Sequence, residues 1–515
     1  MRHASFFTAP LLLLTLAGSP AAQDGGSTFG QARARELAEL GRLPTTHDVV
    51  VRDIVNYHRH RLPLPKADRD VALEVRFDRG AAGADDTVLL QVGYTTRPEG
   101  DRAFVPYVSV ALVVDCSGSM RERGKMDQVK RGLCAFVERL RNDDEVELIT
   151  FSTAAQVVAE RRPVGKDRRW IQCAIDALQP DNGTNLHAGL MLGLNRLKND
   201  GCRGTDPSHA RRVVLLTDGI ANQGVTDPAQ ILAEARPFTD ASIDISTIGV
   251  GQDLDVPLLG KLARGTRGLF HFVGDEQDVQ KVFVQEAEAL LMPVARRPHL
   301  HIELPRGLTA RRVFHEGVRQ QGTDLFVDLP DLNAGVTGVM VVECQVARDA
   351  DGDRTVHAEL SFDSARTGRP DTESAEADLA AESIWYTVQK GDSLEVIARR
   401  QLGSPSLARQ IADLNPELDA RRLHVGQRLQ LPTRGAVDVE VRKNAAIAVL
   451  AQGLRDMAQA SESKRWADAD RALKLAQDEA RRLFPGADED LQRVRDIAAG
   501  HAHTLQRYVD RFRDY

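Results

Sequence analysis

Residues 110–119 read VALVVDCSGS, where five apolar residues run directly into a loop that carries a carboxylate and two hydroxyls. The apolar run is typical of a buried strand. Asp115, Ser117 and Ser119 follow it at positions i, i+2 and i+4, so their oxygens can face one hard cation. Because ligands of open α/β sheets gather beyond the carboxyl ends of the strands, this stretch predicts a strand that ends in a binding loop.

Short apolar runs alternate with amphipathic helical patterns on the C-terminal side of this stretch, up to about residue 291. The predicted strands are 110–114, 146–151, 213–217, 243–249 and 269–273. Between them, the helix predicted over 185–198 places its leucines on one face. Such alternation predicts a mostly parallel sheet covered by helices on both sides, a doubly wound, Rossmann-like α/β fold.

Two more polar positions belong to the same pattern. Thr184 lies in DNGTN (residues 181–185), just before a predicted helix, and Asp218 lies in TDG (residues 217–219), just after an apolar strand. Two carboxylates and three hydroxyls form an all-oxygen set, which suits Mg²⁺ better than a soft transition metal.

Asp115, Ser117, Ser119, Thr184 and Asp218 together resemble the metal-ion-dependent adhesion site of the von Willebrand factor A family, which is written DxSxS followed by a distant Thr and a distant Asp. The resemblance covers residues 106–293 and implies that these five residues bind Mg²⁺, with Mn²⁺ or Ca²⁺ as alternatives. It also implies a protein partner whose Asp or Glu carboxylate completes the coordination of the metal.

These residues have two other interpretations. The serines and Thr184 can simply cap helices and close turns in a domain that holds no metal. A serine nucleophile is rejected, because no GxSxG elbow surrounds Ser117 or Ser119 and no histidine is placed by motif to act as their base. No catalytic residue is therefore assigned, and the chain is not expected to be an enzyme.

A second motif lies between residues 386 and 432. It reads YTVQKGDSL at 386–394, continues through an Asn-Pro pair at 415–416, and ends in VGQRLQLP at 425–432. This pattern resembles a LysM domain with a βααβ fold, which implies binding of N-acetylglucosamine-containing polymers such as peptidoglycan. The groove implied by the resemblance is lined by Gly391, Asp392, Ser393, Leu394, Asn415 and Pro416. Alternatively, residues 391–393 only form a turn and cap a helix.

The chain ends and linkers complete the predicted organisation. Residues 1–22 have the basic start, short apolar run and small residues of a cleaved signal peptide, and no later stretch has membrane length. The predicted units are 23–66, an N-terminal segment; 67–105 and 294–365, both β-rich; 106–293, the α/β domain; 366–383, a polar linker; 384–433, the LysM unit; and 434–515, an α-helical segment. The Asp53 and Asn56-Tyr57 positions also resemble a segment of exported bacterial von Willebrand A proteins.

Composition argues against one class of partner, nucleic acid. The net charge is −7 with both signs mixed along the chain, and aromatic residues make up 5%, so nucleic acid is not an expected partner. Of the five cysteines, Cys173 and Cys202 are the one pair that could form a disulfide, and most of the five are expected to be small buried residues.

The expected function is that of an exported adhesion or scaffold protein of the periplasm, cell wall or extracellular space. Two alternatives stay open: an envelope assembly factor that works with an ATPase system, and a non-catalytic subunit of a wall-remodelling enzyme.

Overall fold

A computed structural model describes residues 29–79, 87–98, 107–199, 209–251, 254–266, 268–273, 282–284, 286–287, 293–347, 354–379, 383–389, 391–402, 404–418, 423–432 and 437–511. The predicted signal peptide and Cys202 lie outside these residues. Cys116 and Cys344 are buried, and neither is in a disulfide. Within the described residues, no helix is both long and apolar enough to cross a membrane.

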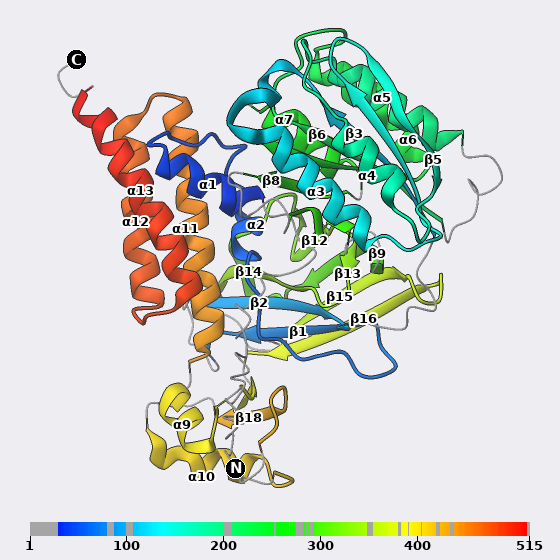
Figure 1. Cartoon of the computed structure of the whole chain (residues 1–515). Coiled ribbons are helices and arrows are strands. Elements are labelled where there is room, and N and C mark those ends of the chain that lie inside the picture. The colour runs from blue at the N-terminus through cyan, green and yellow to red at the C-terminus, as the bar shows by residue number, and fades with distance from the viewer. Residues whose placement is uncertain are drawn as a thin grey trace, which may run out of the picture.

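The predicted α/β domain is confirmed (Figure 1). Its strands are β3 (Tyr107–Asp115), β4 (Glu145–Phe151), β5 (Ala155–Pro163), β6 (His209–Thr217), β7 (Ile243–Val250) and β8 (Phe270–Val273). They lie in the order β5-β4-β3-β6-β7-β8, and all neighbours are parallel except β5 and β4. The strand β5 was not predicted, because its exposed edge carries polar and charged residues between the apolar ones.

Helices cover both faces of this sheet, since its buried strands present apolar side chains on each side. The helices are α3 (Lys125–Arg139), α4 (Arg169–Asp176), α5 (Leu186–Lys198), α6 (Pro228–Asp240) and α7 (Val256–Arg264), and a 3-10 turn η2 (Gly118–Gly124) precedes α3. Val110, Leu112 and Val114 of β3 pack in the core with α3 and α4. Ala111 and Val113 point the other way, into the core with α5, α6 and α7. This alternation makes β3 a fully buried central strand.

The two β-rich segments on either side of the α/β domain form one β-structured unit. One sheet, ordered β1-β2-β14-β10, joins β1 (Val71–Phe77) and β2 (Thr87–Thr96) to β14 (Thr337–Val346) and β10 (Leu308–Val313). The second follows the order β11-β12-β9-β15-β16, with β13 also paired to β9. Its strands are β9 (Pro293–Glu303), β11 (Arg319–Gln321), β12 (Asp324–Asp328), β13 (Leu332–Asn333), β15 (Thr355–Ser364) and β16 (Pro370–Asp378). Both sheets contribute to one apolar core, so the α/β domain is inserted between β2 and β9 of this unit.

The expectation of a polar linker over residues 366–383 was wrong. Most of that stretch forms β16, which pairs with β15 from Thr355↔Asp378 to Asp363↔Pro370. Carboxylates and hydroxyls recur along β16, and only two partly buried alanines, Ala375 and Ala377, pack on the core. An edge strand with so little apolar surface resembles a linker in its composition.

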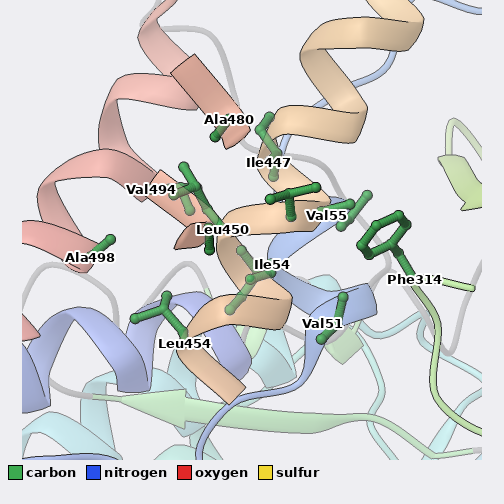
Figure 2. Packing of buried hydrophobic residues seen from close by; sticks show 14 of the residues in the cluster. Val51, Ile54, Val55, Phe314, Ile447, Leu450, Leu454, Ala480, Val494 and Ala498 are labelled. Carbon is green, nitrogen blue, oxygen red and sulfur yellow. The ribbon is translucent and has the colours of Figure 1, made fainter. Parts of the chain in front are cut away.

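The C-terminal segment is helical as expected, with α11 (Val439–Glu462), α12 (Trp466–Leu483) and α13 (Glu489–Arg511). Residues 29–56, here called the N-terminal strap, carry α1 (Phe29–Glu39) and α2 (Val51–Val55) and lie between these helices and the α/β domain (Figure 1). Figure 2 shows Ile54 and Val55 of α2 among Ile447 and Leu450 of α11. The strap thus shares a core with the C-terminal helices.

The opposite end of the strap packs on the α/β domain. Phe29 is fully buried, and its ring stacks on that of Phe270 in β8 with centroids 4.0 Å apart. Arg33 adds a cation–π contact, 5.2 Å from the ring centroid of Phe272. The strap therefore joins the end of the α/β sheet to the helical segment.

A small βααβ unit forms a further region with its own core (Figure 1). Its strands β17 (Ser383–Thr387) and β18 (Arg428–Pro432) pair antiparallel, and α9 (Leu394–Leu402), the 3-10 turn η4 (Pro405–Leu407) and α10 (Ala408–Leu414) lie between them. Ile397, Ile411 and Leu431 belong to its separate core. Arg428 reaches Glu74 of β1 at 3.5 Å, one contact that joins this unit to the β-structured unit.

Candidate functional site

Three loops meet at the carboxyl ends of the central strands. β3 and β6 are parallel neighbours, so Asp115 at the end of β3 and Asp218 just after β6 leave the sheet side by side. The third loop, before α5, donates from the Asp181 amide to the Cys116 carbonyl at 2.5 Å. These backbone connections bring the predicted site residues to one edge of the sheet.

Four of the five predicted residues are in direct contact. The Ser119 hydroxyl donates to Asp218 Oδ1 at 2.7 Å, and the Ser117 and Ser119 hydroxyls lie 3.0 Å apart. Asp115 Oδ1 accepts the Ser117 amide at 2.8 Å, which folds the loop back on the strand end. Asp115, Ser117 and Asp218 are at most 2% exposed, so two carboxylates lie side by side with almost no access to solvent.

The fifth residue, Thr184, joins the site through Asn222. Its amide donates to Asn222 Oδ1 at 2.9 Å, and its hydroxyl accepts from Asn222 Nδ2 at 3.4 Å. Thr184 is 4% exposed. The backbone between it and Asp181 turns through Gly183 at φ +80°, a conformation that favours glycine. Asn222 thereby ties the loop of Thr184 to the loop that carries Asp218.

Besides Asn222, two residues at the site escaped sequence reasoning. The Thr217 hydroxyl donates to Asp115 Oδ2 at 2.7 Å, and the Lys125 ammonium contacts Asp218 Oδ2 at 2.6 Å. Thr217 could have been found from the sequence, because it precedes Asp218 at the end of a predicted buried strand. Lys125 gave no such signal, because a lysine at the start of a helix is ordinarily a surface residue.

The electrostatics of Asp115 follow from its burial. Burial raises the pKa of the Asp115 carboxyl to about 6, and the negative charge of Asp218 acts in the same direction. Hydrogen bonds from Thr217 and Ser117 lower that pKa and limit the shift. An ionised Asp115 is thus costly without a further positive charge nearby.

In the βααβ unit, most of the predicted groove residues have structural contacts. The Asp392 carboxylate accepts from the Tyr386 hydroxyl at 2.6 Å, from the Gln389 amide at 2.8 Å and from Arg400 at 3.2 Å. Asn415 is bonded to both backbone groups of Gln430 at 2.8 Å. Asp392 therefore stabilises the turn that follows β17, and Asn415 fixes the loop after α10 to β18.

The remaining groove residues divide into buried and exposed positions. Ser393 accepts the Val396 amide at 3.3 Å and caps α9, while Leu394 is buried in the core. Gly391, at φ +88°, and Pro416 are exposed at the turn and loop where the groove was predicted. The predicted surface for a glycan therefore lies on the backbone of these two loops more than on polar side chains.

The comparisons with known proteins identify two domains in this chain. Residues 109–285 match the profile of the von Willebrand factor type A domain. The chain contains a von Willebrand factor type A domain. Residues 386–432 match the profile of the LysM domain, so both resemblances found in the sequence are confirmed.

Two curated proteins and one solved structure are similar to this chain at low identity. The Escherichia coli protein YfbK is 24% identical over 375 residues, which span 70% of this chain and 62% of YfbK. Human inter-alpha-trypsin inhibitor heavy chain H4 is 28% identical over 239 residues, 44% of this chain and 25% of the human protein. A solved von Willebrand factor type A protein from Catenulispora acidiphila aligns over 86% of this chain and 91% of its own, with 16% identity and a TM-score of 0.48.

Both domains indicate a role in binding. A von Willebrand domain together with a LysM domain supports protein interaction or adhesion and binding to peptidoglycan. The LysM domain also indicates a location outside the cytoplasm or at the cell wall.

The oxygen set of the von Willebrand domain fits a divalent cation. Within the described residues, no three His, Cys, Asp or Glu side chains are grouped to hold a metal, so hydroxyls would have to serve as ligands. Ser117 and Ser119 supply such hydroxyls beside Asp218. The contact of Asp218 with the Lys125 ammonium shows that the site already attracts a positive charge. Hard oxygen donors of this kind suit Mg²⁺, Mn²⁺ or Ca²⁺.

Proposed function

We propose that this chain is an exported, non-catalytic adhesion or scaffold protein of the cell envelope. Its von Willebrand domain binds a divalent cation, Mg²⁺ above all, through Asp115, Ser117, Ser119, Thr184 and Asp218. The cation then accepts an Asp or Glu carboxylate from a protein partner. The LysM domain holds the chain on an N-acetylglucosamine-containing glycan such as peptidoglycan.

One observation carries the metal part of this proposal. Asp115 and Asp218 are buried together, and the hydroxyls of Ser117 and Ser119 crowd around the same carboxylate as Lys125. Buried carboxylates need positive charge, and one ammonium cannot neutralise two of them. A divalent cation would supply the missing charge and would draw the two serine hydroxyls onto itself as ligands.

Isothermal titration of the full chain with Mn²⁺ and Mg²⁺ tests this site. The wild type is expected to bind one ion, and Asp115→Asn and Asp218→Asn are expected to lose that binding. Asp227→Asn is the matched control, because Asp227 lies at the far end of the loop that follows β6 and its side chain caps α6 through the Ala229 and Gln230 amides, with no hydrogen bond to any of the five described site residues. A wild type that binds neither ion, nor Ca²⁺, contradicts the proposal.

The glycan part rests on the LysM match and on the exposed turn at Gly391. Sedimentation with insoluble peptidoglycan or chitin measures it directly, with the full chain in each case. Gly391→Val is expected to reduce the bound fraction, because a β-branched residue cannot easily adopt φ +88°. The LysM proposal fails if the wild type remains in the supernatant with both polymers.

Gly322→Val controls for backbone strain in that experiment. Gly322 also has a positive φ, +62°, and a Cβ added at either glycine would meet no other atom within 4 Å. Gly322 lies in the turn between β11 and β12, far along the chain from the LysM domain. The control is expected to bind glycan as the wild type does.

A further inference from the structure

Lys125 occupies an unusual place for a surface-type residue. It is the first residue of α3, and its ammonium lies 2.6 Å from Asp218 Oδ2. The lysine side chain is 14% exposed, and that of Asp218 is 0% exposed. The pair is therefore a largely buried ion pair inside the proposed metal site.

The surrounding backbone makes room for this lysine. A Cβ on Gly251 would lie 3.1 Å from Lys125 Cε, so glycine at this position, with φ +84°, leaves space for the lysine stem. The position is also electrostatically unfavourable without a partner, because the N-terminus of a helix carries partial positive charge and disfavours a cation. The contact with Asp218 offsets that repulsion.

Asp218 divides its two oxygens between different donors. Oδ1 accepts from Ser119, and Oδ2 holds Lys125. A divalent cation coordinated by Asp218 would bring two positive charges close to the ammonium, and like charges at such a distance repel strongly in a buried place. The ammonium and the divalent cation therefore compete for one carboxylate.

We infer that Lys125 is a resident counter-ion that a divalent cation must displace from Asp218, so that this lysine sets how tightly the site holds its metal. This inference rests on the proposed metal site. The lysine keeps Asp218 compensated while no metal is bound, since an unpaired buried carboxylate is strongly destabilising. It also restricts metal loading to higher cation concentrations.

Titration of the full chain with Mn²⁺ tests the inference, with Lys125→Met beside the wild type. Methionine keeps the length and apolar stem of the side chain and removes its charge. The Kd for Mn²⁺ is expected to fall about tenfold or more in Lys125→Met, because the cation no longer displaces a buried ion pair. An unchanged or higher Kd would mean that the lysine positions Asp218 for the metal, and would overturn the inference.

Lys130→Met is the matched control. Lys130 lies on the same helix, and its ammonium donates to the exposed Asp176 carbonyl at 2.8 Å. The substitution changes the net charge of the chain by the same amount without touching Asp218. Its Kd is expected to stay within about twofold of the wild type, as for a screened surface charge.

Thermal melting gives a second readout that does not depend on the Kd. Without metal, Lys125→Met is expected to melt at a lower temperature than Lys130→Met, and saturating Mn²⁺ is expected to remove most of that difference. Lys125→Gln serves in the same way if the methionine variant does not fold.

The outcomes separate this inference from the proposed function. If the wild type binds Mn²⁺ and Lys125→Met binds it no more tightly, the inference alone is wrong. If only Lys125→Met binds Mn²⁺, the cation does not displace the lysine in the wild type, and both the proposed function and the inference are wrong. If neither protein binds any divalent ion, the metal site and the inference are both wrong.

Discussion

The Thr217 hydroxyl donates a hydrogen bond of 2.7 Å to Asp115 Oδ2, so strand β6 holds the carboxylate that ends strand β3. Both residues are completely buried. The contact fixes the direction of the Asp115 carboxylate, whose other oxygen accepts the Ser117 amide. A bond across two central strands therefore prepares the loop geometry of the site before any ligand arrives.

Replacing Thr217 with valine removes this donor and preserves the side-chain volume. Because one oxygen of the buried Asp115 carboxylate then loses its donor, the free energy of unfolding is expected to fall by about 1–3 kcal/mol. Urea denaturation of the full chain measures it. Thr239→Val is the control, since Thr239 donates to a carbonyl within its own helix, and equal losses in both variants would contradict the account.

The N-terminal strap is expected to depend on one aromatic anchor. Phe29→Ala removes a fully buried ring that stacks on Phe270, and the free energy of unfolding should fall by about 3–5 kcal/mol. Hydrogen exchange should show faster exchange of the α1 amides than in the wild type. Leu40→Ala, at a residue that is 44% exposed, is expected to leave both the free energy of unfolding and the α1 exchange rates nearly unchanged. If the α1 amides of Phe29→Ala exchange as slowly as those of the wild type, Phe29 does not anchor the strap.

Asp392 is expected to stabilise the LysM domain. Asp392→Asn weakens the contacts with Tyr386, Gln389 and Arg400, so the local free energy of opening should fall by about 1–3 kcal/mol. The exchange rates of the Ile397 and Ile411 amides report this opening. Asp413→Asn is the exposed control on α10. If Asp392→Asn keeps full protection and yet loses glycan binding, Asp392 is a direct ligand instead.

Acid is expected to loosen the contact between the strap and α13. Burial lowers the pKa of His501 to about 4, and its Nε2 lies 2.8 Å from the Ala34 carbonyl. The unfolded chain takes up this proton near pH 6.5, so His501 leaves stability intact above pH 6.5 and reduces it as the pH falls toward 4. The loss from this group amounts to about 3 kcal/mol.

Urea unfolding of the wild type and His501→Gln across this pH range checks the prediction. Glutamine can still donate to the Ala34 carbonyl but does not titrate. The variant is therefore expected to lose less stability than the wild type between pH 6.5 and 4. Parallel curves for the two proteins would show that His501 does not control the acid response.

The α/β domain could be predicted because its signals are local. Each central strand is a continuous apolar run, and the site residues follow two of these runs directly, so the edge where they meet was implied by the parallel arrangement. The LysM domain was predictable for a similar reason, since its motif spans adjacent residues. Both domains were confirmed by their profiles.

The pairing of strands that lie far apart in the sequence could not be predicted in this way. β2 and β14 are adjacent in one sheet, yet the hydrogen bond from Thr96 to Val336 joins residues 240 positions apart. The alternating apolar pattern predicts that each strand has a buried face, and it does not say which strand covers its edge. For the same reason the contact of Lys125 with Asp218, 93 residues away, became visible only in the folded chain.

The most direct test of the account is thermal melting of the full chain with and without Mg²⁺, with Asp115→Ala and Asp218→Ala alongside. A ligand that binds only the folded state raises the melting temperature, so the wild type should gain stability with Mg²⁺ and both variants should not. A wild type whose melting temperature is unchanged by Mg²⁺, Mn²⁺ and Ca²⁺ would contradict the metal-dependent site, and LysM would remain as the binding function that the chain supports.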